Sequence, residues 1–296
     1  MVMNSFNEPD ILFHYTSLDA FFKMIKNKEF WLSDITKSND PLEGVYLIQV
    51  LEEAYDDLYR ERKIYWNDYS LIHRAFLLFK ENFFRYGRTR DFYGAASFCT
   101  SAHELSMLKI YADKGEGVAL GVPVHILNSL TKINPHLIFR KIEYLSREEL
   151  MNRARDFCVE QIRNFRDKIT DINEETLRPL VEAIEKWCNN GFFIKDPANK
   201  DEEEYRLLYR HNDIFEHYLP QFGESIPEEI DFTTQGGDLK AHYKIPIGEV
   251  EKSDFYFRSI TLAPLCKSSI GDIQAFLRKY GIKGCNIDKN TWVKMR

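Results

Sequence analysis

The stretch ILFHYTSLDAFFKMIKNKEFWLSDITKSNDPLEG, residues 11–44, predicts a short strand, a helix, a second strand and a turn. Its first six residues are rich in β-formers, and apolar residues recur at helical spacing from Leu18 onward, behind a cap at Ser17 or Thr16. FWLSD (30–34) predicts the second strand, and KSNDPLEG is rich in turn-forming residues. Polar side chains therefore fall at the ends of elements, where they can converge on a ligand without disturbing a core.

The rest of the chain alternates irregularly between strand-like and helical segments. Residues 45–85 and 146–190 carry apolar residues at helical spacing, and further strands are expected at GAASFCTS (94–101), EYRLLYR (204–210) and YFRSITLAPL (256–265). This order favours an α+β fold over a doubly wound parallel sheet. We expect a mixed, mainly antiparallel sheet with helical insertions, as one domain over 1–296 with a helical insertion at 146–190.

Composition excludes several classes of protein. A net charge of −6 over 296 residues gives no global basic field for nucleic acid. The five cysteines form no C-x-x-C pair, and the eight histidines show no metal-ligand spacing, so no bound metal is predicted. Residues 1–10 are polar and the apolar runs are short, which predicts a cytoplasmic protein without signal peptide or membrane association.

Two groups of polar residues in the opening stretch are candidates for a site. His14 and Tyr15 are neighbours on a strand, so their side chains point to opposite faces and only one can enter a given cleft. A lone strand histidine is more often structural than functional. Asn39 and Asp40 before a proline are typical of a turn, and Glu43 would complement the dipole of the next helix.

A third group lies in DEEEYRLLYR. Glu202, Glu204 and Arg206 alternate, so a strand would place them on one face and the intervening residues on the other. Burying such charges is costly unless they are paired. Either they form an exposed, salt-bridged edge, or Glu204 faces a cleft with Arg206 beside it and stabilises a cationic transition state.

Four short motifs make the chain resemble a bacterial domain family of unknown function. Their order is H-Y-T, N-D-P-x-E, Y-A-x-x-x-x-G and E-x-E-x-R. Here they are His14-Tyr15-Thr16, Asn39-Asp40-Pro41-x-Glu43, Tyr111-Ala112 with Gly117, and Glu202-x-Glu204-x-Arg206. The closing segments also resemble that family, although Ala263 stands where glycine is usual. The resemblance covers nearly the whole chain.

The opening layout is also similar to that of ADP-ribosyltransferases, more distantly. That resemblance implies an ADP-ribosyltransferase-like sheet, with NAD as substrate and no metal. It also implies that His14 holds the NAD ribose, that Tyr111 or the adjacent Tyr15 stacks on nicotinamide, and that Glu204 is catalytic. Residues expected to line the NAD site are His14, Tyr15, Thr16, Asn39, Asp40, Glu43 and Arg206.

The leading hypothesis is therefore an NAD-using ADP-ribosyltransferase-like enzyme, acting on a protein or nucleic-acid acceptor as a toxin or antiphage effector. A non-catalytic module that binds a nucleotide or nucleic acid in the same cleft is the alternative. A metal-dependent nuclease would instead require its carboxylates to meet at an ion. The carboxylates available for it are Asp40, Glu43, Glu202 and Glu204.

Overall fold

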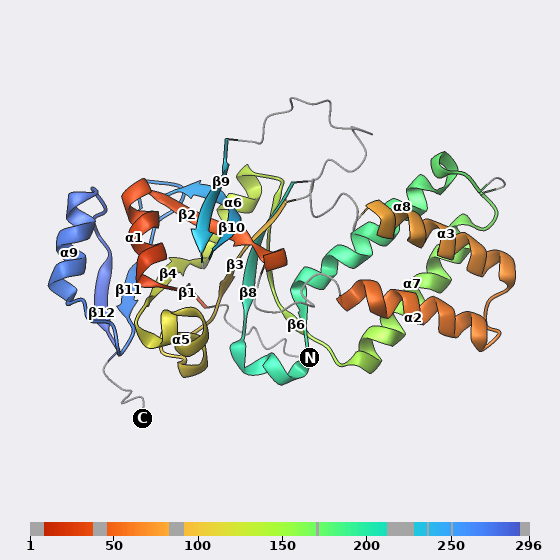
Figure 1. Cartoon of the computed structure of the whole chain (residues 1–296), viewed down its shortest axis with the longest axis horizontal. Coiled ribbons are helices and arrows are strands. Elements are labelled where there is room, and N and C mark those ends of the chain that lie inside the picture. Colours follow the sequence, from red (N-terminus) through yellow and green to blue (C-terminus); the bar gives the residue numbers. More distant parts are fainter. Residues whose placement is uncertain are drawn as a thin grey trace, which may run out of the picture.

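The computed structural model describes residues 9–37, 46–82, 92–169, 172–211, 228–235, 237–249 and 251–290. Within these ranges two β-sheets, flanked by short helices, lie beside a group of four longer helices (Figure 1). The fold is α+β with mostly antiparallel strand pairs, as the order of elements predicts.

The first sheet has four strands and carries His14. Its order is β1 (Ile11–Thr16), β4 (Val118–Pro123), β11 (Ser259–Leu262) and β12 (Asn286–Lys289). Only the β11–β12 pair is parallel, and helix α9 (Ile270–Lys279) makes the crossover between these two strands. All six residues of β4 are buried, so this strand forms the centre of the sheet.

The second sheet has six strands, all antiparallel to their neighbours. Its order is β5 (Leu137–Lys141), β8 (Tyr205–His211), β3 (Phe92–Phe98), β2 (Glu29–Asp34), β10 (Asp238–Pro246) and β9 (Ile230–Gln235). A parallel pair, β6 (Glu143–Tyr144) and β7 (Ile194–Lys195), lies at its side. Phe13 and Cys99 join the two larger sheets, since each N–H donates to the other's carbonyl at 2.8 and 2.9 Å.

Three further helices pack around the sheets. They are α1 (Leu18–Asn27), α5 (Leu105–Tyr111) and α6 (Val124–Ile133). Ser17 is the N-cap of α1, because its hydroxyl accepts from the N–H of Ala20 at 3.1 Å. Phe30 of β2, Leu120 of β4 and other buried apolar side chains of both sheets form one shared core. Short 3₁₀ turns lie at η1 (Ile35–Lys37), η3 (Asp113–Gly115), η4 (Asn189–Phe193) and η5 (Pro197–Glu202).

The four longer helices have an apolar core of their own. They are α2 (Tyr46–Arg60), α3 (Trp66–Asn82), α7 (Arg147–Phe165) and α8 (Glu174–Cys188). Capping boxes at Ser146 and Asn173 begin α7 and α8. The 146–190 segment thus packs against α2 and α3 (Figure 1). That the chain is a single domain stays a prediction.

The structure corrects two expectations about strands and helices. A single mixed sheet, as the sequence predicts, would hold both the His14 strand and the Glu204 strand, but β1 belongs to the four-stranded sheet, and Glu204 immediately precedes β8 of the six-stranded sheet. Helix α6 was not anticipated. Its N-cap is Pro123, which offers no side-chain cap, so the apolar run of β4 continues into the helix without a polar boundary.

Gly117 is needed for the close approach of the first sheet to helix α5. A Cβ at this position would lie 2.2 Å from the carbonyl oxygen of Thr16 and 3.0 Å from Ala112. Both neighbours are backbone atoms of packed elements and cannot move aside without disturbing β1. The glycine of the Y-A-x-x-x-x-G motif therefore has a structural reason to be there.

We expect Gly117→Ala to lower the free energy of unfolding by roughly 1–3 kcal/mol, the usual cost of overpacking. Gly271→Ala is the matched control, because its added Cβ would meet nothing closer than 3.6 Å. Urea denaturation of both variants measures the difference. Equal midpoints for Gly117→Ala and the wild type would contradict this reading of the contact.

Candidate functional site

Residues of the H-Y-T and E-x-E-x-R motifs meet at the segment Ser97–Ser101, where β3 ends. His14 Nδ1 lies 2.9 Å from the Ser97 carbonyl, and the Ser97 side chain is hydrogen-bonded to Glu204. The Tyr15 hydroxyl donates to the Ser101 carbonyl at 2.6 Å. The Thr100 hydroxyl donates to Glu203 at 2.7 Å. Segment 97–101 thus links the H-Y-T motif to the E-x-E-x-R motif across the junction of the two sheets.

His14 is held as a neutral imidazole of defined orientation. A carbonyl can only accept, so Nδ1 carries the hydrogen and Nε2 keeps its lone pair. Burial lowers the pKa of His14, and the bond to Ser97 only partly opposes that shift. Phe30 and Phe98 pack on the ring with centroids at 5.1 and 5.7 Å, which fixes its plane.

Glu204 lies between two cations in the interior. Its side chain is 2% exposed. Oε1 accepts from Arg206 Nε at 3.0 Å and Nη2 at 2.7 Å, while Oε2 lies 2.6 Å from Lys195 Nζ. Burial alone would raise the pKa of Glu204, but Arg206, Lys195 and the Ser97 hydrogen bond together hold it below its ordinary value. The carboxylate is therefore ionised at neutral pH.

Most of the hydrogen-bonding capacity of Glu204 is used. A carboxylate offers about four acceptor positions. Two are taken by Arg206 and one by Lys195. The Ser97 side chain also lowers the pKa of Glu204 as a hydrogen-bond donor. Ser97 is the uncharged donor of the set, so its exchange for another donor, such as a substrate hydroxyl, costs the least electrostatic energy.

Lys195 and Arg206 attach the site to the chain that leads out of α8. Lys195 also bonds Glu202 at 2.7 Å, and the two carboxylates raise the pKa of Lys195 against the opposing effect of burial. Arg206 Nη1 donates to the Phe192 carbonyl at 2.6 Å. The N–H of Glu204 donates to the Tyr144 hydroxyl at 2.9 Å. Glu204 and its partner Arg206 thus tie η4, β6, β7 and β8 together.

The other predicted residues are distributed unevenly around this cluster. Tyr15 is buried on the opposite face of β1 from His14, with its hydroxyl held by Ser101 and Glu104. Thr16 is buried at the end of β1. Tyr111 ends α5 and is 41% exposed. Arg206 belongs to the cluster. Asn39, Asp40 and Glu43 lie outside the described residues.

Sequence reasoning missed Ser97, Lys195 and Tyr144, which contact Glu204 directly. Ser97 sits in a segment that the sequence marks only as a strand, and Lys195 is one cation among many. Glu202 and Glu204 share Lys195, so an ammonium occupies the position between these carboxylates. Within the described ranges no three His, Cys, Asp or Glu side chains are arranged to hold a metal ion.

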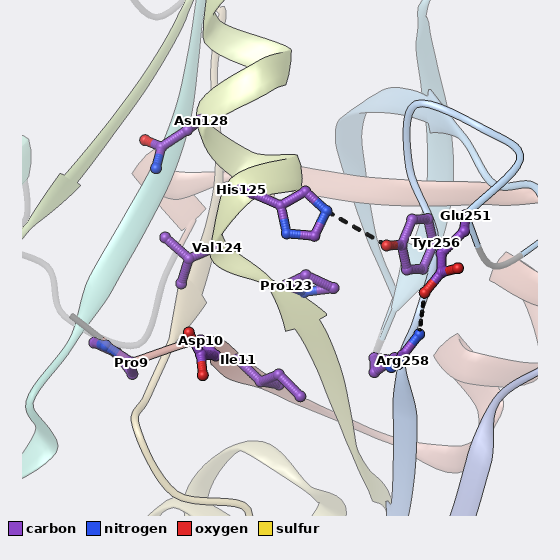
Figure 2. A pocket seen from close by; sticks show the side chains of 10 residues that line it. All are labelled: Pro9, Asp10, Ile11, Pro123, Val124, His125, Asn128, Glu251, Tyr256 and Arg258. Carbon is purple, nitrogen blue, oxygen red and sulfur yellow. Dashed lines mark hydrogen bonds and ion pairs between the residues drawn. The ribbon is translucent and has the colours of Figure 1, made fainter. Parts of the chain in front are cut away.

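A separate cavity of about 530 Å³ opens where β1 begins and β4 runs into α6 (Figure 2). His125 projects from the first turn of α6, and its Nε2 lies 3.4 Å from the Tyr256 hydroxyl; Arg258 pairs with Glu251 at 2.6 Å beside it. None of its lining residues was predicted as a site residue. They are Pro9, Asp10, Ile11, Pro123, Val124, His125, Asn128, Glu251, Tyr256 and Arg258.

Comparison with known proteins gives no match to this chain among family models, curated proteins or solved structures. The two family resemblances in the motifs therefore stay expectations. Across the described ranges, every helix is too short or too polar to cross a membrane.

We expect Glu204→Gln to lower the free energy of unfolding by about 3–5 kcal/mol, because Lys195 and Arg206 would stay buried without the charge that compensates them. Chemical denaturation at pH 7 measures the change. Glu203→Gln is the matched control. Glu203 is exposed and its bond from Thr100 survives the substitution, so a change within about 0.5 kcal/mol is expected.

The pH dependence of that stability difference provides a second measurement. The folded-state pKa of Glu204 is lowered, so its contribution is complete above the unfolded-state pKa of about 4.3 and is lost as pH falls through the folded-state value. The difference in the free energy of unfolding between the wild type and Glu204→Gln should stay constant from about pH 8 to 5 and should decrease below about pH 4. A difference in the free energy of unfolding that grows as pH falls would contradict the lowered pKa of Glu204.

Proposed function

We propose that this chain is an ADP-ribosyltransferase-like enzyme that uses NAD as its substrate. The observation that carries the proposal is the position of Ser97, which bonds His14 through its carbonyl and Glu204 through its side chain. Two residues 190 positions apart, which the motif resemblance assigns to one reaction, thus lie on either side of a single serine.

His14 is suited to hold a ribose. Its Nδ1–H is committed to Ser97, so Nε2 is an acceptor for a sugar hydroxyl. Because the pKa of His14 is lowered, the imidazole keeps that lone pair at neutral pH. Tyr111 ends α5, whose Met107 and Leu108 pack with Tyr15 on the face of β1 opposite His14, and the ring of Tyr15 is buried. The proposal therefore assigns nicotinamide stacking to neither tyrosine.

Glu204 would act by charge. Cleavage of the bond between nicotinamide and ribose leaves the electron pair on nicotinamide and positive charge on the sugar. A fixed carboxylate stabilises that charge, and it is already ionised here. An acceptor nucleophile then bonds to the ribose carbon through its lone pair and releases its proton to solvent. For Glu204 to contact the ribose 2′-hydroxyl, that hydroxyl replaces Ser97 as a donor to the carboxylate.

A second candidate function is a non-catalytic module that binds a nucleotide beside His14. The burial of Glu204 and its pairing with Arg206 and Lys195 favour it, because a carboxylate neutralised by two cations loses part of its field at the ligand. In that case the cluster only stabilises the fold and His14 alone contacts the ligand. The two candidates differ in whether bound NAD is consumed.

We expect the wild-type protein to bind NAD and to release nicotinamide in the presence of a protein or nucleic-acid acceptor. His14→Asn keeps a donor toward the Ser97 carbonyl but removes the Nε2 acceptor, so NAD binding should weaken by about 10-fold, the equivalent of one hydrogen bond. His125→Asn, in the cavity of Figure 2, is the matched control and should bind NAD as the wild type does. Calorimetric titration measures NAD binding, and an assay of released nicotinamide measures NAD consumption.

Each outcome separates the candidates. NAD binding without nicotinamide release, lost in His14→Asn, favours the binding module. Weaker NAD binding in His125→Asn and unchanged NAD binding in His14→Asn would move the NAD site to the cavity of Figure 2. A wild-type protein that neither binds nor consumes NAD contradicts the enzyme proposal. Thermal melts of both variants exclude unfolding as the cause.

A further inference from the structure

A second cavity, of about 710 Å³, lies between the end of α6, the start of β5 and the end of β10. It shares no lining residue with the cavity of Figure 2. Ile133, which lines it, is 65% exposed, so the cavity opens to solvent there. Concave, mainly apolar spaces of this size are the usual binding sites of small molecules. The apolar side chains of its wall include Leu130, Ile133, Leu137, Ile245, Pro246 and Ile247.

Two polar side chains in the wall of this cavity, Asn134 and Tyr243, form a pair of hydrogen-bond donors. The Asn134 Oδ1 accepts from the N–H of His136 at 2.9 Å, and the Asn134 Nδ2 donates to the Tyr243 hydroxyl at 2.9 Å. Each oxygen of the pair thus already accepts a hydrogen bond. The second Nδ2 hydrogen and the hydroxyl hydrogen of Tyr243 have no acceptor among the described residues. One carbonyl oxygen has two lone pairs and can accept from both.

Both donors are held in place by their surroundings. Asn134 is the C-cap of α6, and its N–H donates to the Leu130 carbonyl at 2.9 Å. The Tyr243 side chain is 8% exposed and its ring stacks on Tyr209 with centroids 3.8 Å apart. Burial raises the pKa of Tyr243, and the bond from Asn134 only partly opposes that shift, so the hydroxyl keeps its hydrogen at neutral pH. A buried donor without an acceptor is unfavourable, and a ligand oxygen would remove that cost.

The charges at the edge of the cavity favour an uncharged ligand. Lys252 is neutralised by Glu249, whose Oε2 lies 2.7 Å from the Lys252 Nζ. Asp254 is exposed and has no ion-pair partner in the part of the chain that the structure describes. An anionic ligand would therefore face the charge of Asp254, and a cationic ligand would find only donors at Asn134 and Tyr243.

We propose that this cavity binds an uncharged, mainly apolar small molecule through a carbonyl oxygen that accepts from the Tyr243 hydroxyl and the Asn134 Nδ2. Ketones, esters and amides have the required acceptor, and the apolar wall covers the rest of such a molecule. The proposal is independent of NAD chemistry, because the cavity contains neither His14 nor any residue of the Glu204 cluster.

A pair of matched probes tests the carbonyl contact on the full chain. Benzophenone carries a ketone between two apolar rings, and diphenylmethane has the same rings joined by a CH₂ group. Ligand-observed NMR titration measures the Kd of each compound. Benzophenone should bind about 10-fold tighter than diphenylmethane, the equivalent of one hydrogen bond. The anion 4-benzoylbenzoate should bind no tighter than benzophenone.

Tyr243→Phe removes the hydroxyl and keeps the ring that stacks on Tyr209. It should weaken benzophenone binding by about 10-fold and leave diphenylmethane binding unchanged. Tyr256→Phe is the matched control, because Tyr256 is also a buried tyrosine but its hydroxyl lies in the cavity of Figure 2. Thermal melts of both variants exclude unfolding as the cause.

A surface variant tests the same cavity without altering its buried wall. Ile133→Glu places a charge at the opening and should weaken the binding of both compounds, whereas Ile110→Glu, at an exposed position of α5 outside the cavity, should not. Three results would each overturn the proposal. They are a wild-type protein that does not bind benzophenone, equal affinity for benzophenone and diphenylmethane, and benzophenone binding that is unchanged in Tyr243→Phe.

Discussion

The ionised carboxylate of Glu204, buried between Arg206 and Lys195, is the constraint on which the rest of the site depends. A charge in the interior persists only when its partners are held against it, and here each partner comes from a different part of the chain. Lys195 follows the four-helix group, Arg206 lies in β8, and Ser97 is the residue before the last of β3. Their common anion fixes how the helical group meets the six-stranded sheet.

The same constraint positions the first sheet. Ser97 holds His14 through its carbonyl, and two residues later Cys99 pairs with Phe13 in the only bridge between the sheets in the described part of the chain. Displacing Glu204 would therefore change the position of His14 through Ser97. Fold stability and the geometry of the candidate site cannot be altered separately at this carboxylate, whereas His14 can be altered without leaving a buried charge unpaired.

Local parts of this arrangement were predictable from the sequence. The strand at Ile11–Thr16 and the cap at Ser17 follow from short-range patterns, and the alternation of Glu204 and Arg206 places them on one side of the backbone. Long-range partners were not predictable. Ser97 lies 107 residues from Glu204 and carries no motif, and Lys195 pairs with Glu204 only because a 3₁₀ turn, Pro197–Glu202, brings the chain back. The division of the strands into two sheets depends on such long-range pairings, so the sequence did not predict it.

The most direct test is a ¹⁵N NMR titration of histidine-labelled protein with NAD. If His14 and Glu204 border one NAD site, His14 shows the Nδ1–H tautomer at neutral pH, and its Nε2 resonance moves upfield on NAD binding as the lone pair accepts a ribose hydroxyl, while His125 and His242 do not change. Saturation with NAD that leaves the His14 resonances unchanged would contradict the assignment of this junction as the NAD site.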